Sequence, residues 1–73
     1  MRVFELHIDD DRYRIPTLAF MTMIDEQRAL EFAQEKLTES RHHLGVEVRE
    51  NGVRLFGLGT MEVADEPPRS TPD

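Results

Sequence analysis

Hydrophobic and polar residues alternate near the start of the chain. Phe4, Leu6 and Ile8 are separated by polar residues, which is the period of two expected of a strand with one buried face. These three side chains are therefore predicted to face a core. Val3 and His7 are predicted to lie on the opposite face of the same strand.

A second extended segment is predicted over residues 13–21, after a turn-prone run at residues 9–12. Pro16 lies within this segment and has no N–H for a sheet ladder. The strand is therefore expected at an edge of the sheet, or bulged or broken at the proline. The two segments together form the first predicted hairpin.

The second hairpin has the stronger signal, Asn-Gly at positions 51 and 52 between two β-rich runs. A type I′ turn needs positive φ at both central residues, which these residue types tolerate. The register set by this turn predicts that Val48 opposes Leu55 and that Glu47 opposes Phe56. One face should then hold Val46, Val48, Leu55 and Val53, and the other should be a mixed face of Glu47, Arg49, Arg54, Phe56 and Leu58.

A helix is predicted between the hairpins, from a capping signal of Thr22 and Asp25 to the histidines at 42 and 43. At about 100° per residue its apolar positions form one stripe that should pack on the apolar sheet face. Phe32 projects away from that stripe among charged residues, so it is either a single exposed aromatic or a contact residue. The predicted stripe comprises Met23, Leu30, Ala33, Leu37 and Leu44.

These elements predict an α+β domain in the order β-β-α-β-β, with a four-stranded antiparallel or mixed sheet and one helix packed on one face. Residues 1–59 are predicted to form this single small domain. Residues 60–73 contain three of the four prolines and carry −3 of the formal charge of −6. They are expected to form a disordered acidic tail.

Composition narrows the functional classes. The 73 residues include no cysteine, which removes disulfides and thiolate chemistry. Fifteen acidic against nine basic residues disfavour nucleic-acid binding, in which Lys and Arg neutralise phosphates. No apolar run approaches the roughly 18 residues of a membrane span, so no membrane association and a cytoplasmic location are expected.

The segment ESRHHLG, residues 39–45, holds the strongest candidate chemistry. Glu39 and His42 have the Glu-x-x-His spacing of di-metal helical bundles, in which other helices supply further ligands. The simpler interpretation is a basic last helical turn stopped by Gly45, since cations compensate the negative end of the helix dipole. We therefore expect no catalytic residue, cofactor or metal and no enzyme activity. A metal-dependent enzyme using Glu39 and His42 is the third hypothesis.

The leading hypothesis is a noncatalytic protein-interaction module, because one helix can cover only one face of the sheet and exposed apolar surface bordered by charge often marks an interface. We expect a homodimer through the uncovered face or an edge strand, or binding to another protein. The alternative is an acidic regulator or inhibitor that occupies a basic or nucleic-acid-binding surface of another protein, with Glu31, Glu35 and Glu39 as its acidic ridge. The predicted interface residues are Val3, Phe32, Glu47, Arg49, Arg54, Phe56 and Leu58.

Overall fold

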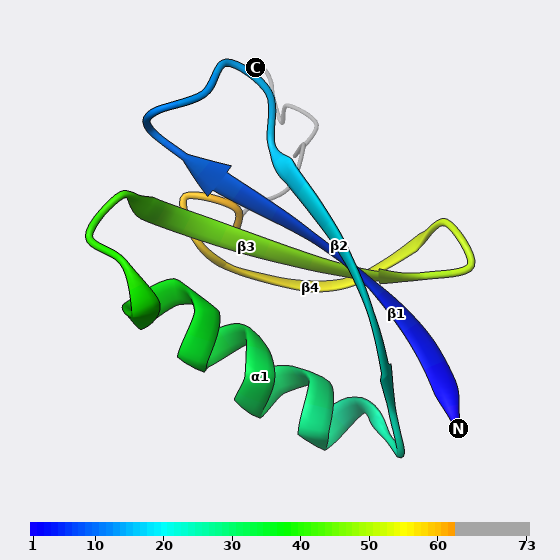
Figure 1. Ribbon diagram of the computed structural model, residues 1–73. Coiled ribbons are helices and arrows are strands. Elements are labelled where there is room, and N and C mark those ends of the chain that lie inside the picture. Colours follow the sequence, from blue (N-terminus) through cyan, green and yellow to red (C-terminus); the bar gives the residue numbers. More distant parts are fainter. Residues whose placement is uncertain (63–73) are drawn as a thin grey trace, which may run out of the picture.

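The chain folds into one antiparallel sheet with one helix along it (Figure 1). The computed structural model describes residues 1–62. Neighbouring strands are all antiparallel and follow the order β2-β1-β3-β4. The predicted α+β class is therefore confirmed, and β2 lies at an edge as expected. The elements are β1 (Arg2–Asp10), β2 (Thr17–Met23), α1 (Glu26–Glu39), β3 (His43–Glu50) and β4 (Val53–Gly59).

The core lies between α1 and one face of the sheet. Alternate residues of the central strands β1 and β3 point toward the helix, as the period of two predicts for β1. The helix contributes two alanines, whose small side chains let its backbone approach the sheet closely. The fully enclosed apolar side chains are Phe4, Leu6, Ile8, Ala29, Ala33, Val46 and Val48.

A β-bulge interrupts the regular pairing of β3 with β4. The two turn residues have φ values of 55° and 80°, as a type I′ turn requires, and Arg49 opposes Arg54. The register then shifts, so that Val48 opposes Phe56 instead of Leu55. The predicted register is therefore wrong beyond the bulge, because one extra residue of β4 has no partner in β3.

The bulge turns the apolar residues of β4 toward the helix. Phe56 and Leu58 oppose the two buried valines of β3 and pack against the core. Their predicted position on the uncovered face is wrong, because a shift of one residue exchanges the two faces of a strand. Arg54 remains on the uncovered face, where its Nε donates to Glu47.

The helix begins and ends at other residues than predicted. Asp25 is its N-cap and accepts a hydrogen bond from the Arg28 N–H at 3.0 Å, so the predicted capping box does not form. Glu39 is the last helical residue, and Ser40 has an extended backbone. Within residues 1–62, no helix is long and apolar enough to cross a membrane.

Part of the predicted tail belongs to the folded domain. Thr60 donates its N–H to the Leu44 carbonyl at 3.0 Å, and the Glu62 N–H donates to the Gly59 carbonyl at 3.0 Å. These bonds hold a turn directly after β4. The rest of the predicted tail, residues 63–73, lies outside the described residues.

Candidate functional site

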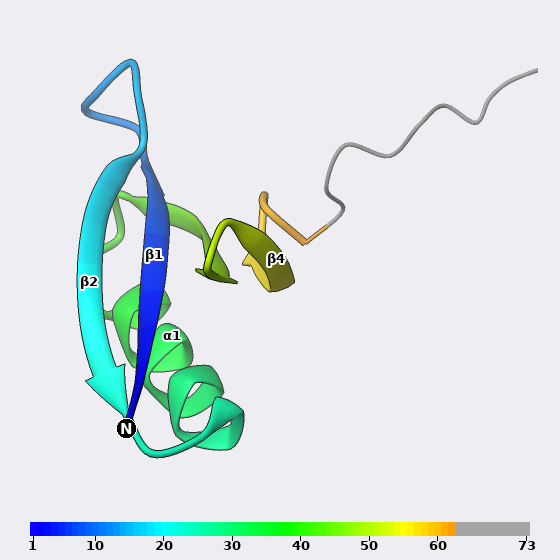
Figure 2. The same cartoon turned by 90° about the vertical axis from the view of Figure 1, so that its right-hand side faces the viewer.

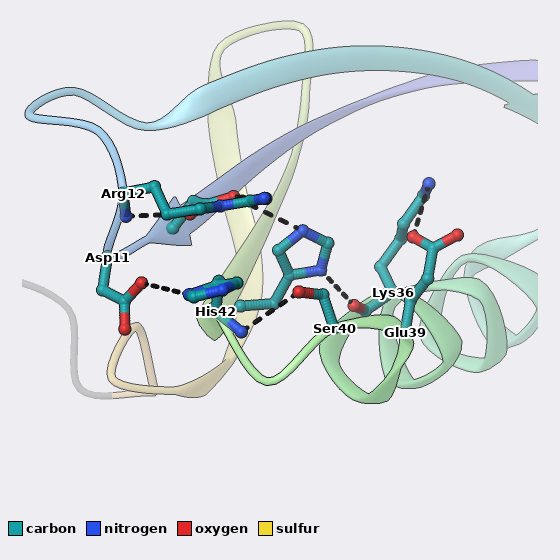
Figure 3. Close-up of polar contacts among 8 residues, drawn as sticks. Asp11, Arg12, Lys36, Glu39, Ser40 and His42 are labelled. Atoms are coloured by element: carbon teal, nitrogen blue, oxygen red, sulfur yellow. Dashed lines mark hydrogen bonds and ion pairs between the residues drawn. The ribbon is translucent and has the colours of Figure 1, made fainter.

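His42 lies in the turn before β3 and His43 is the first residue of β3, so neither histidine belongs to the helix. The His42 N–H donates to Ser40 Oγ, and His43 Nδ1 lies 2.7 Å from the Lys36 carbonyl oxygen (Figure 3). A carbonyl oxygen only accepts, so this ring nitrogen donates and satisfies one of the free carbonyls at the helix end. The predicted last helical turn of Arg41, His42 and His43, stopped by Gly45, is therefore wrong, because the helix ends at Glu39 and Gly45 belongs to β3.

Each histidine also approaches a carboxylate at the end of β1 or in the loop that follows it. His42 Nδ1 lies 2.8 Å from Asp11 Oδ1 (Figure 3), and His43 Nε2 lies 3.7 Å from Asp10 Oδ2. Asp10 is buried and accepts two hydrogen bonds from the Arg12 guanidinium, which hold the pKa of Asp10 well below its usual range. The network joins the first hairpin to the end of the helix.

The Glu39–His42 pair does not have the geometry that its spacing suggests. Glu-x-x-His places two ligands on one helix face only where the helix continues, and here it ends at Glu39. Glu39 forms an ion pair with Lys36 at 3.0 Å, whereas His42 turns toward Asp11. Among residues 1–62, no group of three or more metal-ligating side chains is found.

The acidic ridge predicted on α1 is partly paired within the helix. Glu31 accepts from the Arg28 guanidinium at 2.9 Å, and Glu39 accepts from Lys36. Both pairs have the (i, i+3) spacing that joins neighbours on a helix surface. The folded domain therefore presents less uncompensated negative charge on this ridge than the sequence suggests.

The uncovered face of the sheet has a polar half on β3 and β4. Glu47 is only 8% exposed and accepts from Arg49 Nε at 2.9 Å and from Arg54 Nε at 3.0 Å. Arg54 also donates to the backbone carbonyls of Met61 and Glu62. Three predicted interface residues thus form one intramolecular cluster, which holds the C-terminal turn on the sheet.

The turn of residues 60–62 covers this polar half closely. A side-chain carbon added at Gly45 would lie 2.7 Å from the Met61 nitrogen, and one added at Gly57 would lie 2.7 Å from the Met61 carbonyl carbon. Both distances are shorter than real contacts allow, so the two glycines permit the turn to lie against β3 and β4. Little of this half remains open to a partner.

The other half of the uncovered face, on β1 and β2, combines exposed apolar side chains with Glu5 and His7, which lie opposite Phe20 and Leu18 and pair with each other at 3.2 Å. Val3 on β1 and Leu18 and Phe20 on β2 are 56%, 50% and 62% exposed, and we call these three residues the apolar patch. Val3 lies on the uncovered face as predicted. The sequence interpretation missed Leu18 and Phe20 because Pro16 obscured their register. The uncharged composition of residues 17–23 was the signal that could have found them.

Within residues 1–62, no strand pairs with the outer edge of β2, and we call it the open edge (Figure 2). Its sequence, TLAFMTM, has no charged residue and no proline. The Leu44 carbonyl accepts from the Thr60 N–H, so the backbone carbonyl of Leu44 points toward β4. Along each strand of an antiparallel sheet, the N–H and C=O groups of successive residues point to opposite neighbouring strands. Through the register of the three strand pairs, this alternation leaves the N–H and C=O groups of Leu18, Phe20 and Thr22 directed outward from the edge of β2.

A groove lies between the C-terminal end of β2 and the outer side of α1. It has a volume of about 360 Å³, with an apolar floor and a charged rim. Phe32 lines this groove from α1. It is half-buried against the core, and Lys36 Nζ lies 5.6 Å from its ring centre. The lining residues are Met1, Met23, Ile24, Arg28, Glu31, Phe32 and Glu35.

The described residues therefore offer four surface features, which are a polar network, an apolar patch, an open edge and a groove. The histidine, aspartate and arginine network has its polar atoms paired within the chain. The apolar patch and the open edge, in contrast, meet on β2, and the groove adjoins them. No protein-family model matches the chain, and no curated protein or solved structure is found to be similar to it.

Proposed function

We propose that the protein is a noncatalytic interaction module that self-associates by antiparallel pairing of β2 with β2 of a second copy. The observation that carries this proposal is the open, uncharged edge of β2 beside the apolar patch. Proteins usually protect such an edge with a charge, a proline, a bulge or a covering segment. Thr17–Met23 contains no charge or proline and pairs with β1 without a bulge.

Phe20, the middle residue of β2, provides a natural position for a two-fold axis. When Phe20 lies opposite its own copy, Leu18 opposes Thr22, and the outward backbone groups of all three residues find partners. Opposed residues share a face, so the apolar patches of the two copies become neighbours. The strand also brings no like charges together across the axis.

Size-exclusion chromatography with light scattering, at two protein concentrations and at low and high salt, tests the proposal. We expect a dimer whose mass does not change with salt, because the paired strands carry no charge. A wild-type monomer under all four conditions would overturn the proposal.

A matched pair of variants locates the contact. Phe20→Lys should give a monomer, because it places two like charges on the axis. Val53→Lys should remain a dimer, since Val53 is also 62% exposed but lies on the other edge strand, β4. Dissociation of both variants alike would mean that β2 is not the specific contact.

The lack of cysteine in the chain permits a direct test of the axis. In a hydrogen-bonded antiparallel pair, opposed Cα atoms are about 5.5 Å apart, which lies within the range of a disulfide. Phe20→Cys should therefore form a covalent dimer under mild oxidation, visible on a non-reducing gel. Val53→Cys is the control and should stay monomeric on the same gel.

A further inference from the structure

We infer that the groove between β2 and α1 receives the side chain of Ile15 from a second copy of the chain. The inference rests on the proposed β2 pairing and assigns a second contact to the same dimer. Ile15 belongs to the loop between β1 and β2, and in the groove it would meet the apolar floor formed by Met23, Ile24 and Phe32.

Strand pairing by itself offers too little area for a stable dimer. The seven residues of β2 form an edge about 24 Å long and about 10 Å thick, so two paired edges bury roughly 500 Å² in total. Specific interfaces between proteins bury about 1,200–2,000 Å². A stable dimer therefore needs further contacts beside the edge.

The groove lies where the paired strand of the second copy would continue. With Phe20 on the axis, Thr17 of the second copy opposes Met23, and the residues before Thr17 run beside Ile24. Met23 and Ile24 both line the groove. The loop that precedes β2 in one copy is therefore carried to the groove of the other.

Ile15 has the position and the chemistry to enter this groove. Its side chain is 74% exposed in the single chain. Pro16 follows it and restricts Ile15 to extended conformations. The chain bends at residues 13–15 before β2 begins at Thr17, so Ile15 lies just outside the strand, two residues before the position that would oppose Met23. Transfer of this side chain into an apolar groove removes exposed apolar surface from water.

Charges at the groove rim favour the same occupant. Glu31 and Glu35 line the rim, and among residues 1–62 Glu31 pairs with Arg28 whereas Glu35 forms no ion pair. Arg14, next to Ile15, forms no ion pair within residues 1–62. The loop thus brings a cation toward an acidic rim, which complements the apolar contact.

A cysteine pair tests the contact in the full chain. Ile15→Cys combined with Ile24→Cys should give a covalent dimer under mild oxidation. The two positions are nine residues apart along an extended strand, about 30 Å, so they cannot form a disulfide within one chain. Each single variant serves as a control and should stay monomeric on a non-reducing gel.

Phe20→Cys in a parallel experiment separates the two claims. Covalent dimers from both Phe20→Cys and the double variant would support the groove contact. A covalent dimer from Phe20→Cys alone would overturn the groove contact and leave the strand pairing intact. Failure of Phe20→Cys to cross-link would overturn the proposed pairing itself.

The contribution of Ile15 to affinity gives a second, independent readout. Ile15→Ser should raise the dimer dissociation constant about tenfold or more, because it removes the buried apolar side chain. Tyr13→Ser in the same loop removes another exposed side chain and should change the constant less than about threefold. Equal effects of the two substitutions would contradict a specific role for Ile15.

Discussion

The strands β2 and β4 form the two edges of the sheet (Figure 2), and their side chains give these edges different surfaces. The β4 strand has a bulge in its pairing and carries Arg54, and the turn of residues 60–62 folds against its uncovered face. The β2 strand has no charge, pairs regularly with β1, and has two large apolar side chains exposed on its uncovered face.

This difference shows how one small sheet can direct association to a single edge. Bulges and charged side chains at an edge oppose strand addition, because they interrupt the ladder and are costly to desolvate. Both devices occur on β4 and neither occurs within β2. A second strand is therefore expected to pair with β2.

The largest effect on stability is expected where the turn covers β4. Gly57→Ala should lower the free energy of unfolding by about 1–3 kcal/mol, because the added methyl group would overlap the Met61 carbonyl and the Arg54 guanidinium. Urea unfolding measures this loss. Thr22→Ala, an exposed change on β2, should alter the same free energy by less than about 0.5 kcal/mol. Equal losses would mean that β4 is no more closely covered than β2.

A smaller loss of unfolding free energy is expected when the guanidinium of Arg54 on β4 is removed. Arg54→Met keeps most of the aliphatic volume but removes the donor to the buried Glu47, so it should cost about 1–2 kcal/mol of unfolding free energy. Arg28→Met breaks an exposed ion pair with Glu31 and should cost less than about 0.5 kcal/mol. If urea unfolding gives the same loss for both, the Arg54 cluster contributes no more than a surface pair.

The smallest effect on stability is expected from the Asp10–Arg12 pair, at the end of β1 and the start of the loop before β2. Arg12 lowers the pKa of Asp10 in the folded state below the value of about 4 in the unfolded chain. The ionised Asp10 therefore contributes its full stabilisation above about pH 5. This contribution is lost as the pH falls from the unfolded pKa toward the lower pKa of the folded state. Asp10→Asn should be less stable than wild type at neutral pH, and its stability should fall less steeply between about pH 5 and pH 3.

Urea unfolding across this pH range measures the difference in slope. Some acid sensitivity should remain in Asp10→Asn, because Arg2 lowers the pKa of Glu50 in the same way. An unchanged slope in the variant would show that the Asp10–Arg12 pair is not coupled to folding.

Local patterns predict those parts of the fold that local forces decide. The alternation in β1 and the Asn-Gly turn are correctly predicted, because each depends on a few neighbouring residues. The bulge in β4 is not predicted, since it follows from the burial of Phe56 and Leu58 against a helix distant in sequence. The end of α1 is likewise decided at a distance, where His43 pairs with Asp10 of β1.

The candidate surface likewise has parts that local patterns predict and parts that depend on distant contacts. The grouping of Arg49 and Arg54 with Glu47 is predicted correctly, because the turn sets Arg49 opposite Arg54 and the alternation along β3 places Glu47 on the same face as Arg49. The positions predicted for Phe56 and Leu58 lie beyond the bulge and are wrong. The exposed side chains of β2 depend on the pairing with β1, which Pro16 made difficult to predict.

The sequence by itself determined the order of the elements, the core face of β1, the lack of thiol chemistry and the lack of charge in residues 17–23. Only the tertiary structure decided which of the apolar residues stay in water. The single helix covers one face of the sheet, so Val3, Leu18 and Phe20 on the opposite face stay exposed, and the strand order places β2 at an edge. The surface that we propose for self-association exists because these two consequences of the tertiary structure meet on β2.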